Sequence, residues 1–249
     1  MGVSCTRDDR TAVITLDWPE RRNALGPAEA AELAAVLAGL ADDPQLSAAV
    51  LTGNGAFCAG GDLHAIRELA EQGPDAVRDA VYGVFQKLVL TMTALPVPLI
   101  AAVDGAAIGL GLDLALACDR RVIGPRGWLA QGWWQVGLIA GTGGVHLLNR
   151  LSPVALWEML GSADRVTCAR AVQLGLAAAA PDGALTAALA DAERLGRIPR
   201  PALLGYVELS RAALRKSLEA HLRECLRLQV DLITAPGFLE RTARFAERR

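Results

Sequence analysis

The chain of 249 residues is long enough for one large α/β domain or for a core with an appendage. Its formal net charge of −2 leaves no global basic field, so we expect no nucleic-acid partner. Asp113 interrupts the best apolar stretch, which is too short to cross a membrane, and the polar start of the chain shows no apolar signal segment. We therefore expect a cytoplasmic protein with no membrane partner.

The cysteines and histidines lack the spacing of a metal or disulfide framework. The five cysteines are far apart and include no CxxC pair, which favours free thiols in a reducing compartment. No pair of the three histidines has the spacing of metal ligands. We expect no metal site.

Short strands alternate with helices over roughly the first half of the chain. Helical spacing begins after Pro27 and runs to about residue 40, and it returns from residue 63 to about residue 95 with a break at Gly73-Pro74. Bounded runs of β-branched and apolar residues predict strands at 11–17, 48–52, 99–103, 120–123 and 128–130. This alternation predicts an α/β fold with a mostly parallel sheet.

The second half of the chain has helical patterns almost throughout. Helices are predicted at 145–151, 153–160 and 168–174, and then three more from residue 185 onward, separated near 199–201 and 236–237. We divide the chain into a core with the ligand site at residues 1–185 and a helical region for packing and oligomerisation at residues 186–249.

The segment 98–119 joins a buried strand, a turn and an apolar helix that follows Gly109 and Gly111. A helix that starts directly after such a turn presents free N–H groups and the positive end of its dipole, so we expect negative charge there. Asp113 lies in the first turns of this helix and is the leading candidate for an acid or base. A second glycine-rich loop, at residues 53–62, allows close approach of a ligand.

Seven short segments follow one another along nearly the whole chain. They are NAL at 23–25, AFCAGGDL at 56–63, PLIAAVDG at 98–105, GLGLDLALACD at 109–119, VGL at 136–138 with GTGG at 141–144, AVQLGL at 171–176 and RFAER at 244–248. This series resembles the enoyl-CoA hydratase/isomerase (crotonase) superfamily. The order of the segments makes the resemblance specific, because each segment alone is a weak signal.

The resemblance implies a crotonase-like spiral of ββα units whose helical C-terminal region packs in homotrimers or homohexamers. It implies an acyl-CoA thioester as ligand, with coenzyme A as part of the substrate and no separate cofactor. The backbone N–H groups of Gly61 and Leu110 would form the oxyanion hole. The coenzyme A moiety would be lined by Arg22, Ala24, Ala59, Asp62 and Leu63, with Arg248 near its nucleotide.

Two positions depart from the pattern of the family's hydratases, which use two glutamates to activate one water. The first glutamate is matched by Asp113, and the second falls on Trp133. An indole cannot act as a base, so hydration by two carboxylates is not expected. Trp133 and Trp134 are instead candidates for the wall of an acyl pocket, where bulky aromatic groups select the acyl chain.

The expected function is that of a lyase or isomerase acting on an acyl-CoA, of the hydratase/dehydratase or isomerase type. Gly61 and Leu110 would stabilise the thioester enolate, and Asp113 would be the single acid–base group. Two alternatives stay open: a thioester hydrolase or decarboxylase on the same fold, and a non-catalytic acyl-CoA-binding auxiliary protein of a biosynthetic pathway. The acyl group and the direction of reaction are left undetermined.

Overall fold

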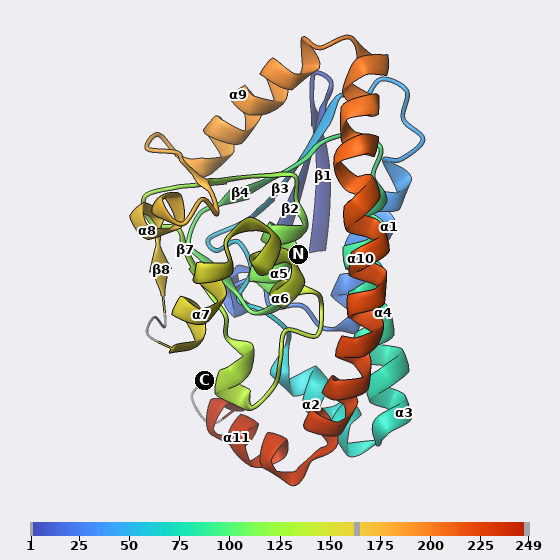
Figure 1. The fold of residues 1–249 in the computed structure, drawn as a ribbon, viewed down its shortest axis with the longest axis vertical. Helices are drawn as coiled ribbons and strands as arrows, with labels where there is room; N and C mark the ends of the chain where they lie inside the picture. Colours follow the sequence, from blue (N-terminus) through green and yellow to red (C-terminus); the bar gives the residue numbers. More distant parts are fainter. Residues whose placement is uncertain (1, 162–164, 247–249) are drawn as a thin grey trace.

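Two sheets built mainly from parallel strands form the centre of the protein, whose computed structural model describes residues 2–161 and 165–246 (Figure 1). The larger sheet has the strand order β1-β2-β3-β4-β6-β9, and the smaller has the order β5-β7-β8. The strands are β1 (Gly2–Asp8), β2 (Thr11–Asp17), β3 (Ala48–Gly53), β4 (Leu99–Val103), β5 (Ala106–Ile108), β6 (Arg120–Ile123), β7 (Trp128–Ala130), β8 (Val166–Thr167) and β9 (Ala178–Ala179). Only the β1–β2 and β7–β8 pairs are antiparallel within the described residues. The predicted α/β class with a mostly parallel sheet is confirmed.

Helices cover these sheets and make up most of the second half of the chain. They are η1 (Pro19–Arg21), α1 (Pro27–Gly39), α2 (Leu63–Glu71), α3 (Pro74–Ala76), η2 (Val77–Tyr82), α4 (Gly83–Ala94), α5 (Leu110–Ala117), η3 (Trp133–Val136), α6 (Gly144–Leu151), α7 (Pro153–Gly161), α8 (Cys168–Gln173), α9 (Ala184–Gly196), α10 (Arg200–Thr234) and α11 (Pro236–Ala246). The predicted helices are present, with bounds within a few residues. The segment η2 is a π-helical turn, which sequence periodicity did not indicate.

Both faces of the larger sheet are covered. On one face, the small residues Ala184, Ala188 and Ala192 of α9 pack on apolar residues of the central strands, such as Val50 and Ile100. The other face packs against α1 and α4 in the main core. Burial on both faces explains why β3 and β4 are continuous apolar runs and do not alternate apolar with polar residues.

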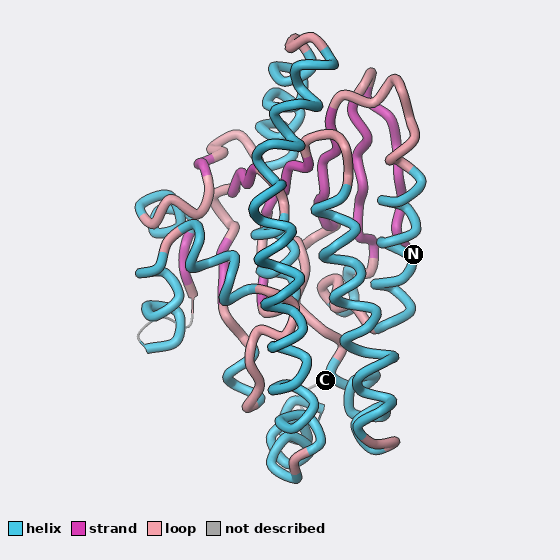
Figure 2. Tube along the Cα trace, turned by 45° about the vertical axis from the view of Figure 1, so that its right-hand side comes forward, coloured by secondary structure: helices cyan, strands magenta, loops and turns pink. Residues whose placement is uncertain are grey.

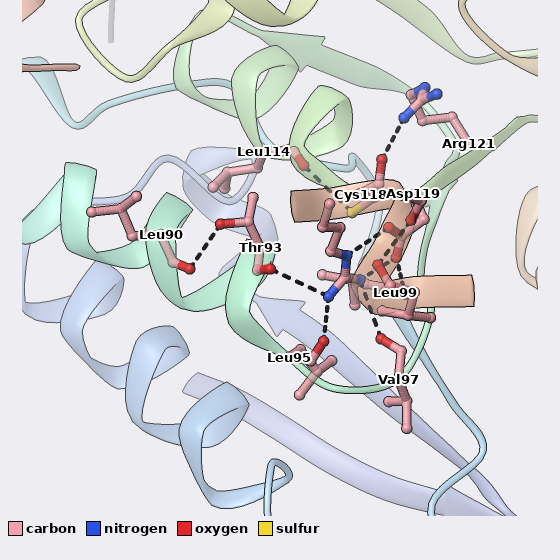
Figure 3. Close-up of polar contacts among 12 residues, drawn as sticks. Leu90, Thr93, Leu95, Val97, Leu99, Leu114, Cys118, Asp119 and Arg121 are labelled. Carbon is pink, nitrogen blue, oxygen red and sulfur yellow. Dashed lines mark hydrogen bonds and ion pairs between the residues drawn. The ribbon is translucent and has the colours of Figure 1, made fainter. Parts of the chain in front are cut away.

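The long helix α10 lies beside α4 along one side of the molecule (Figure 2). Arg211 of α10 is only 2% exposed. Its guanidinium donates to Asp119, and also to the carbonyl oxygens of Leu95 and Val97 in the turn before β4 (Figure 3). Asp119, two residues after the end of α5, also accepts from the Leu99 amide at 2.7 Å. One guanidinium therefore joins α10, the start of β4 and the end of α5.

Replacing Arg211 by methionine is expected to lower the free energy of unfolding by about 2–3 kcal/mol, because Asp119 and three backbone carbonyls lose a buried donor. The figure is below the full cost of breaking a buried pair because the Asp119 side chain is one quarter exposed. Denaturant unfolding checks it. Arg227→Met, which breaks an exposed pair with Glu224 on the same helix, is the matched control and should lower the stability much less. Equal losses for the two variants would contradict this role of Arg211.

Two glutamine side chains hold the glycine-rich loop between η3 and α6. Gln229 of α10 accepts from the Ile139 amide at 3.1 Å and donates to the Ile139 carbonyl and the Tyr82 hydroxyl. Gln86 of α4 donates to the Gly141 carbonyl at 2.9 Å and also to α10. The neighbouring Thr142 is thereby fixed in position.

None of the helices in residues 2–161 and 165–246 combines the length and the apolar character that crossing a membrane requires.

Candidate active site

A cavity of about 570 Å³ opens where the two glycine-rich loops meet, and η3 and α11 close its other side. It is lined by Arg21, Arg22, Ala24, Ala59, Gly60, Gly61, Asp62, Leu63, His64, Arg67, Ile108, Gly109, Leu110, Trp128, Gly132, Trp133, Gln135, Val136, Arg165 and Thr242. Residues that are far apart in the sequence therefore line one cavity. This size falls in the range of small-molecule sites.

The two glycine-rich loops are held together by backbone hydrogen bonds. The Cys58 amide donates to the Ala106 carbonyl at 2.9 Å, and the Ile108 amide donates to the Cys58 carbonyl at 3.0 Å. Only a residue without a side chain fits at Gly111, because a Cβ there would lie 2.1 Å from the Cys58 carbonyl oxygen. Gly109, with φ of 52°, makes the turn into α5 in a conformation that favours glycine.

The backbone amides of Gly61 and Leu110 are free at this junction. Leu110 is the first residue of α5, so its N–H has no acceptor within the helix. The Gly61 N–H takes no part in the bridge to Leu25, in which Leu25 donates to Gly60 and Asp62 donates to Leu25. Among the described residues neither amide donates to a protein acceptor. Both residues line the cavity, so two backbone amides with no acceptor among the described residues lie at a ligand-sized space.

A strained turn places the predicted coenzyme A segment beside them. Arg22 and Asn23 both have positive φ, 52° and 58°, which is uncommon for residues with side chains. The buried Asn23 side chain fixes this turn by accepting from the Trp18 amide at 2.8 Å and donating to the Ala56 carbonyl at 2.7 Å. The Arg22 carbonyl then accepts from the Ala59 amide. This explains the asparagine of the NAL segment as a structural residue.

Asp113 is completely buried on α5. Its Oδ2 accepts from the Thr142 hydroxyl and, at 3.3 Å, from Trp133 Nε1, while Oδ1 has no hydrogen-bond partner among the described residues. Burial raises the pKa of Asp113 from 3.8 to about 7, and the hydrogen bonds from Thr142 and Trp133 only partly oppose this. The carboxyl can therefore gain or lose a proton near neutral pH.

The Trp133 indole lies between Asp113 and the cavity. Trp133 is 4% exposed and lines the cavity, whereas Asp113 does not. The ring is packed against the two glycine-rich loops: a Cβ on Gly109 would lie 3.5 Å from Nε1, and one on Gly61 would lie 3.8 Å from Cη2. Asp113 can reach a ligand at the two amides only if this ring moves aside.

Most of the residues expected at the site lie together. Gly61, Leu110 and Trp133 line the cavity, and so do the residues expected at coenzyme A, namely Arg22, Ala24, Ala59, Asp62 and Leu63. Asp62 also has a structural part, because it caps α2 by accepting from the His64 amide and pairs with Arg21. Trp134 is 44% exposed and is not among the lining residues. Arg248 lies outside the described residues.

Several lining residues escaped the sequence analysis. Arg67 donates to the Leu239 carbonyl and the Thr242 hydroxyl, which ties α2 to α11 at the edge of the cavity. Trp128 lies in β7 of the smaller sheet and Arg165 directly precedes its strand β8; the first strand of this sheet, β5, was not predicted. Thr142 lies inside the GTGG segment, but nothing in the sequence indicated that its hydroxyl meets Asp113.

Cys58 is a core residue despite its place in the loop. Burial raises the pKa of its thiol to about 12, so it carries no thiolate at neutral pH. This environment does not suit a nucleophile.

Comparisons with known proteins point in one direction. A family model described as enoyl-CoA hydratase/isomerase matches residues 6–249. The chain is 34% identical over 244 residues to a probable enoyl-CoA hydratase of Mycobacterium tuberculosis, covering 95% of this chain and 94% of that one. It is 32% identical over 197 residues to (E)-benzylidenesuccinyl-CoA hydratase of Thauera aromatica, covering 78% and 74%. A solved enoyl-CoA hydratase/isomerase from Mycobacterium paratuberculosis superposes with a TM-score of 0.90 at 30% identity, covering 97% of each chain.

Proposed function

The chain belongs to the enoyl-CoA hydratase/isomerase family, and we propose that within this family it is a lyase or isomerase that forms a thioester enolate. The observation that carries the proposal is the pair of unpaired amides, Gly61 and Leu110, at one cavity. Two N–H donors aimed at a thioester oxygen stabilise the negative charge that grows there when the α-carbon loses a proton. Each such donor contributes roughly 3–4 kcal/mol in a site shielded from water.

Asp113 is the proposed acid–base group. Its pKa of about 7 suits a group that takes a proton from one carbon and returns it to another position or to a leaving group. For this, the indole of Trp133 has to turn away when the acyl group enters. The length of its hydrogen bond to Oδ2, 3.3 Å, makes that bond one of the weaker contacts in the site.

The proposal is tested by steady-state assays on a panel of 2-enoyl-, 3-enoyl- and 3-hydroxyacyl-CoA esters. Turnover of at least one of them, with loss of activity when Asp113 is replaced, supports it. Binding of the esters without turnover of any would instead favour an auxiliary acyl-CoA-binding role.

Decarboxylation of a malonyl-type ester is a second candidate function, and the position of Trp133 favours it. In that reaction the bond from the α-carbon to the carboxylate breaks, its electron pair becomes the enolate, CO₂ leaves, and the α-carbon then takes a proton. No base is needed at the start, so a buried Asp113 is no obstacle. An apolar indole beside the oxyanion amides would also disfavour the charged carboxylate relative to the neutral product.

Replacing Trp133 by phenylalanine distinguishes these functions. The variant keeps an aromatic wall but removes the N–H that holds down the pKa of Asp113, so that pKa should rise further. If Asp113 acts as a base, the ascending limb of the kcat/KM profile moves to higher pH. An unchanged profile with full activity on a malonyl-type ester would favour decarboxylation.

A further inference from the structure

The smaller sheet forms one wall of the cavity. Its register pairs Ile108 of β5 with Ala130 of β7, and Leu129 of β7 with Val166 of β8. Because alternate residues of a strand share a face, the side chains of Ile108 and Trp128 lie on the same face, and both line the cavity. Arg165, the residue before β8, falls opposite Ala130 and also lines the cavity. The wall therefore runs from Ile108, next to the loop that carries the Leu110 amide, to the guanidinium of Arg165.

Arg165 is held in place by an aromatic ring and not by a carboxylate of the described residues. Its guanidinium lies 4.3 Å from the centroid of the Trp128 ring, a cation–π contact that restricts the side chain. It forms no ion pair with the residues that the structure describes. Arg21 differs, because it pairs with Glu29 at 2.7 Å and with Asp62.

The charged lining residues Asp62 and Arg67 are engaged by protein groups, which leaves Arg165 available to a ligand. Asp62 is the carboxylate among the lining residues, and it is already engaged by Arg21 and by the α2 amides. Arg67 is occupied by the Leu239 carbonyl and by Thr242. Among the residues that the structure describes, an anion entering this side of the cavity would thus meet an Arg165 guanidinium that has no ion-pair partner, with no free carboxylate in the lining to repel it.

The space between the oxyanion amides and Arg165 is mostly apolar on its walls. Ile108 and Trp128 form one side, and Trp133 and Val136 also line the hollow. Two interstrand spacings separate the backbone of Ile108 from that of Arg165, about 10 Å. This span suits an acyl chain of several carbons that carries a negative charge at its far end.

We propose that Arg165, stacked on Trp128, binds a carboxylate at the distal end of the acyl group, so that the preferred substrates are coenzyme A half-esters of dicarboxylic acids. The inference rests on the proposed function, because it places the thioester at Gly61 and Leu110. A phosphate of coenzyme A offers similar anionic oxygens to a guanidinium. The two sources differ in one respect: a phosphate contact affects every ester equally, whereas a distal carboxylate contact affects only the charged acyl groups.

The test compares the dissociation constants of two saturated six-carbon esters, adipoyl-CoA and hexanoyl-CoA, by calorimetry. They differ only in a terminal carboxylate, and neither needs to be turned over. The wild type should bind adipoyl-CoA about five- to tenfold more tightly, as expected for a charge-assisted contact that stays partly hydrated. Arg165→Gln should remove this preference and leave the dissociation constant of hexanoyl-CoA unchanged. Arg165→Lys should keep part of the preference. Arg22→Gln, on the loop expected to hold coenzyme A, should lower the affinity for both esters by the same factor.

Three other outcomes overturn the inference in distinguishable ways. Equal affinity of the wild type for the two esters would show that no group in the cavity binds a distal carboxylate. Equal weakening of both esters by Arg165→Gln assigns Arg165 to the phosphates of coenzyme A. Failure of the wild type to bind either ester overturns the proposed function itself, and this inference with it.

Discussion

Replacing Leu110 by proline is expected to lower kcat by about 10²–10³-fold, because it removes one of the two donors to the enolate oxygen. The substitution is selective. Leu110 is the first residue of α5, where proline is tolerated because the N–H has no intrahelical acceptor. The helix should therefore still form.

Leu110→Ala is the matched control for this variant, because it keeps the amide and loses most of the same buried side chain. The alanine variant should retain activity within about tenfold of the wild type even if both variants lose comparable stability through the cavity they create. Parallel steady-state assays and thermal melts give the comparison. Similar kcat values for the proline and alanine variants would show that the Leu110 amide does not serve the reaction.

Asp113→Asn is expected to lower turnover by about 10²–10⁴-fold while it stabilises the protein at alkaline pH. The activity falls because an amide cannot exchange a proton with the substrate. Thr142 and Trp133 can still donate to the amide oxygen, so the local structure should be kept. On a malonyl-type ester, by contrast, full activity of this variant would support decarboxylation.

The change in stability follows from the direction of the pKa shift. The folded pKa of Asp113, about 7, lies above the ordinary value of 3.8, so the fold favours the protonated carboxyl. Stability is then greatest at low pH and is lost between about pH 4 and pH 7, as the unfolded chain ionises first. Asn carries no such cost, so the difference in the free energy of unfolding between variant and wild type should grow by about 2–3 kcal/mol from pH 5 to pH 8. Urea unfolding at the two pH values measures it, and a difference independent of pH would contradict a neutral buried Asp113.

Opposite effects on activity and stability are what a functional acid in an apolar site should show. Burying a carboxyl whose Oδ1 has no hydrogen-bond partner in the described part of the chain costs folding free energy. If this residue served packing alone, an uncharged side chain of the same size would fill the site without that cost. Loss of both activity and stability in Asp113→Asn would instead indicate a packing role.

How far the sequence alone predicts this protein depends on the length of each element. Long apolar strands such as β4 and the helices of the second half show clear patterns, and the structure has them. The strand β1 was not predicted because its polar and charged residues lie on an exposed edge strand, where the apolar signal is weak. The strands β5 and β8 have three and two residues, too few for any periodicity.

The candidate site shows the same limit. The glycine loops and Asp113 could be identified because their residue types carry chemistry, and the resemblance placed Trp133 at the second acid position. The contact between Trp133 and Asp113 depends on how η3 folds against α5, which no local pattern contains. Arg165 reaches the cavity only through the pairing of β7 with the two-residue strand β8, so its place could not be predicted from the chain.

Exchange of hydrogen for deuterium at the α-carbon of a bound acyl-CoA tests the central claim most directly, because it reports enolate formation whatever the final product. Hexanoyl-CoA or adipoyl-CoA would be incubated with the enzyme in D₂O and its mass followed over time. The wild type should incorporate deuterium at the α-carbon, and Leu110→Pro and Asp113→Asn should do so much more slowly. A wild type that binds the ester without exchange, or an Asp113→Asn variant that exchanges at the wild-type rate, would contradict an enolate formed between two backbone amides and Asp113.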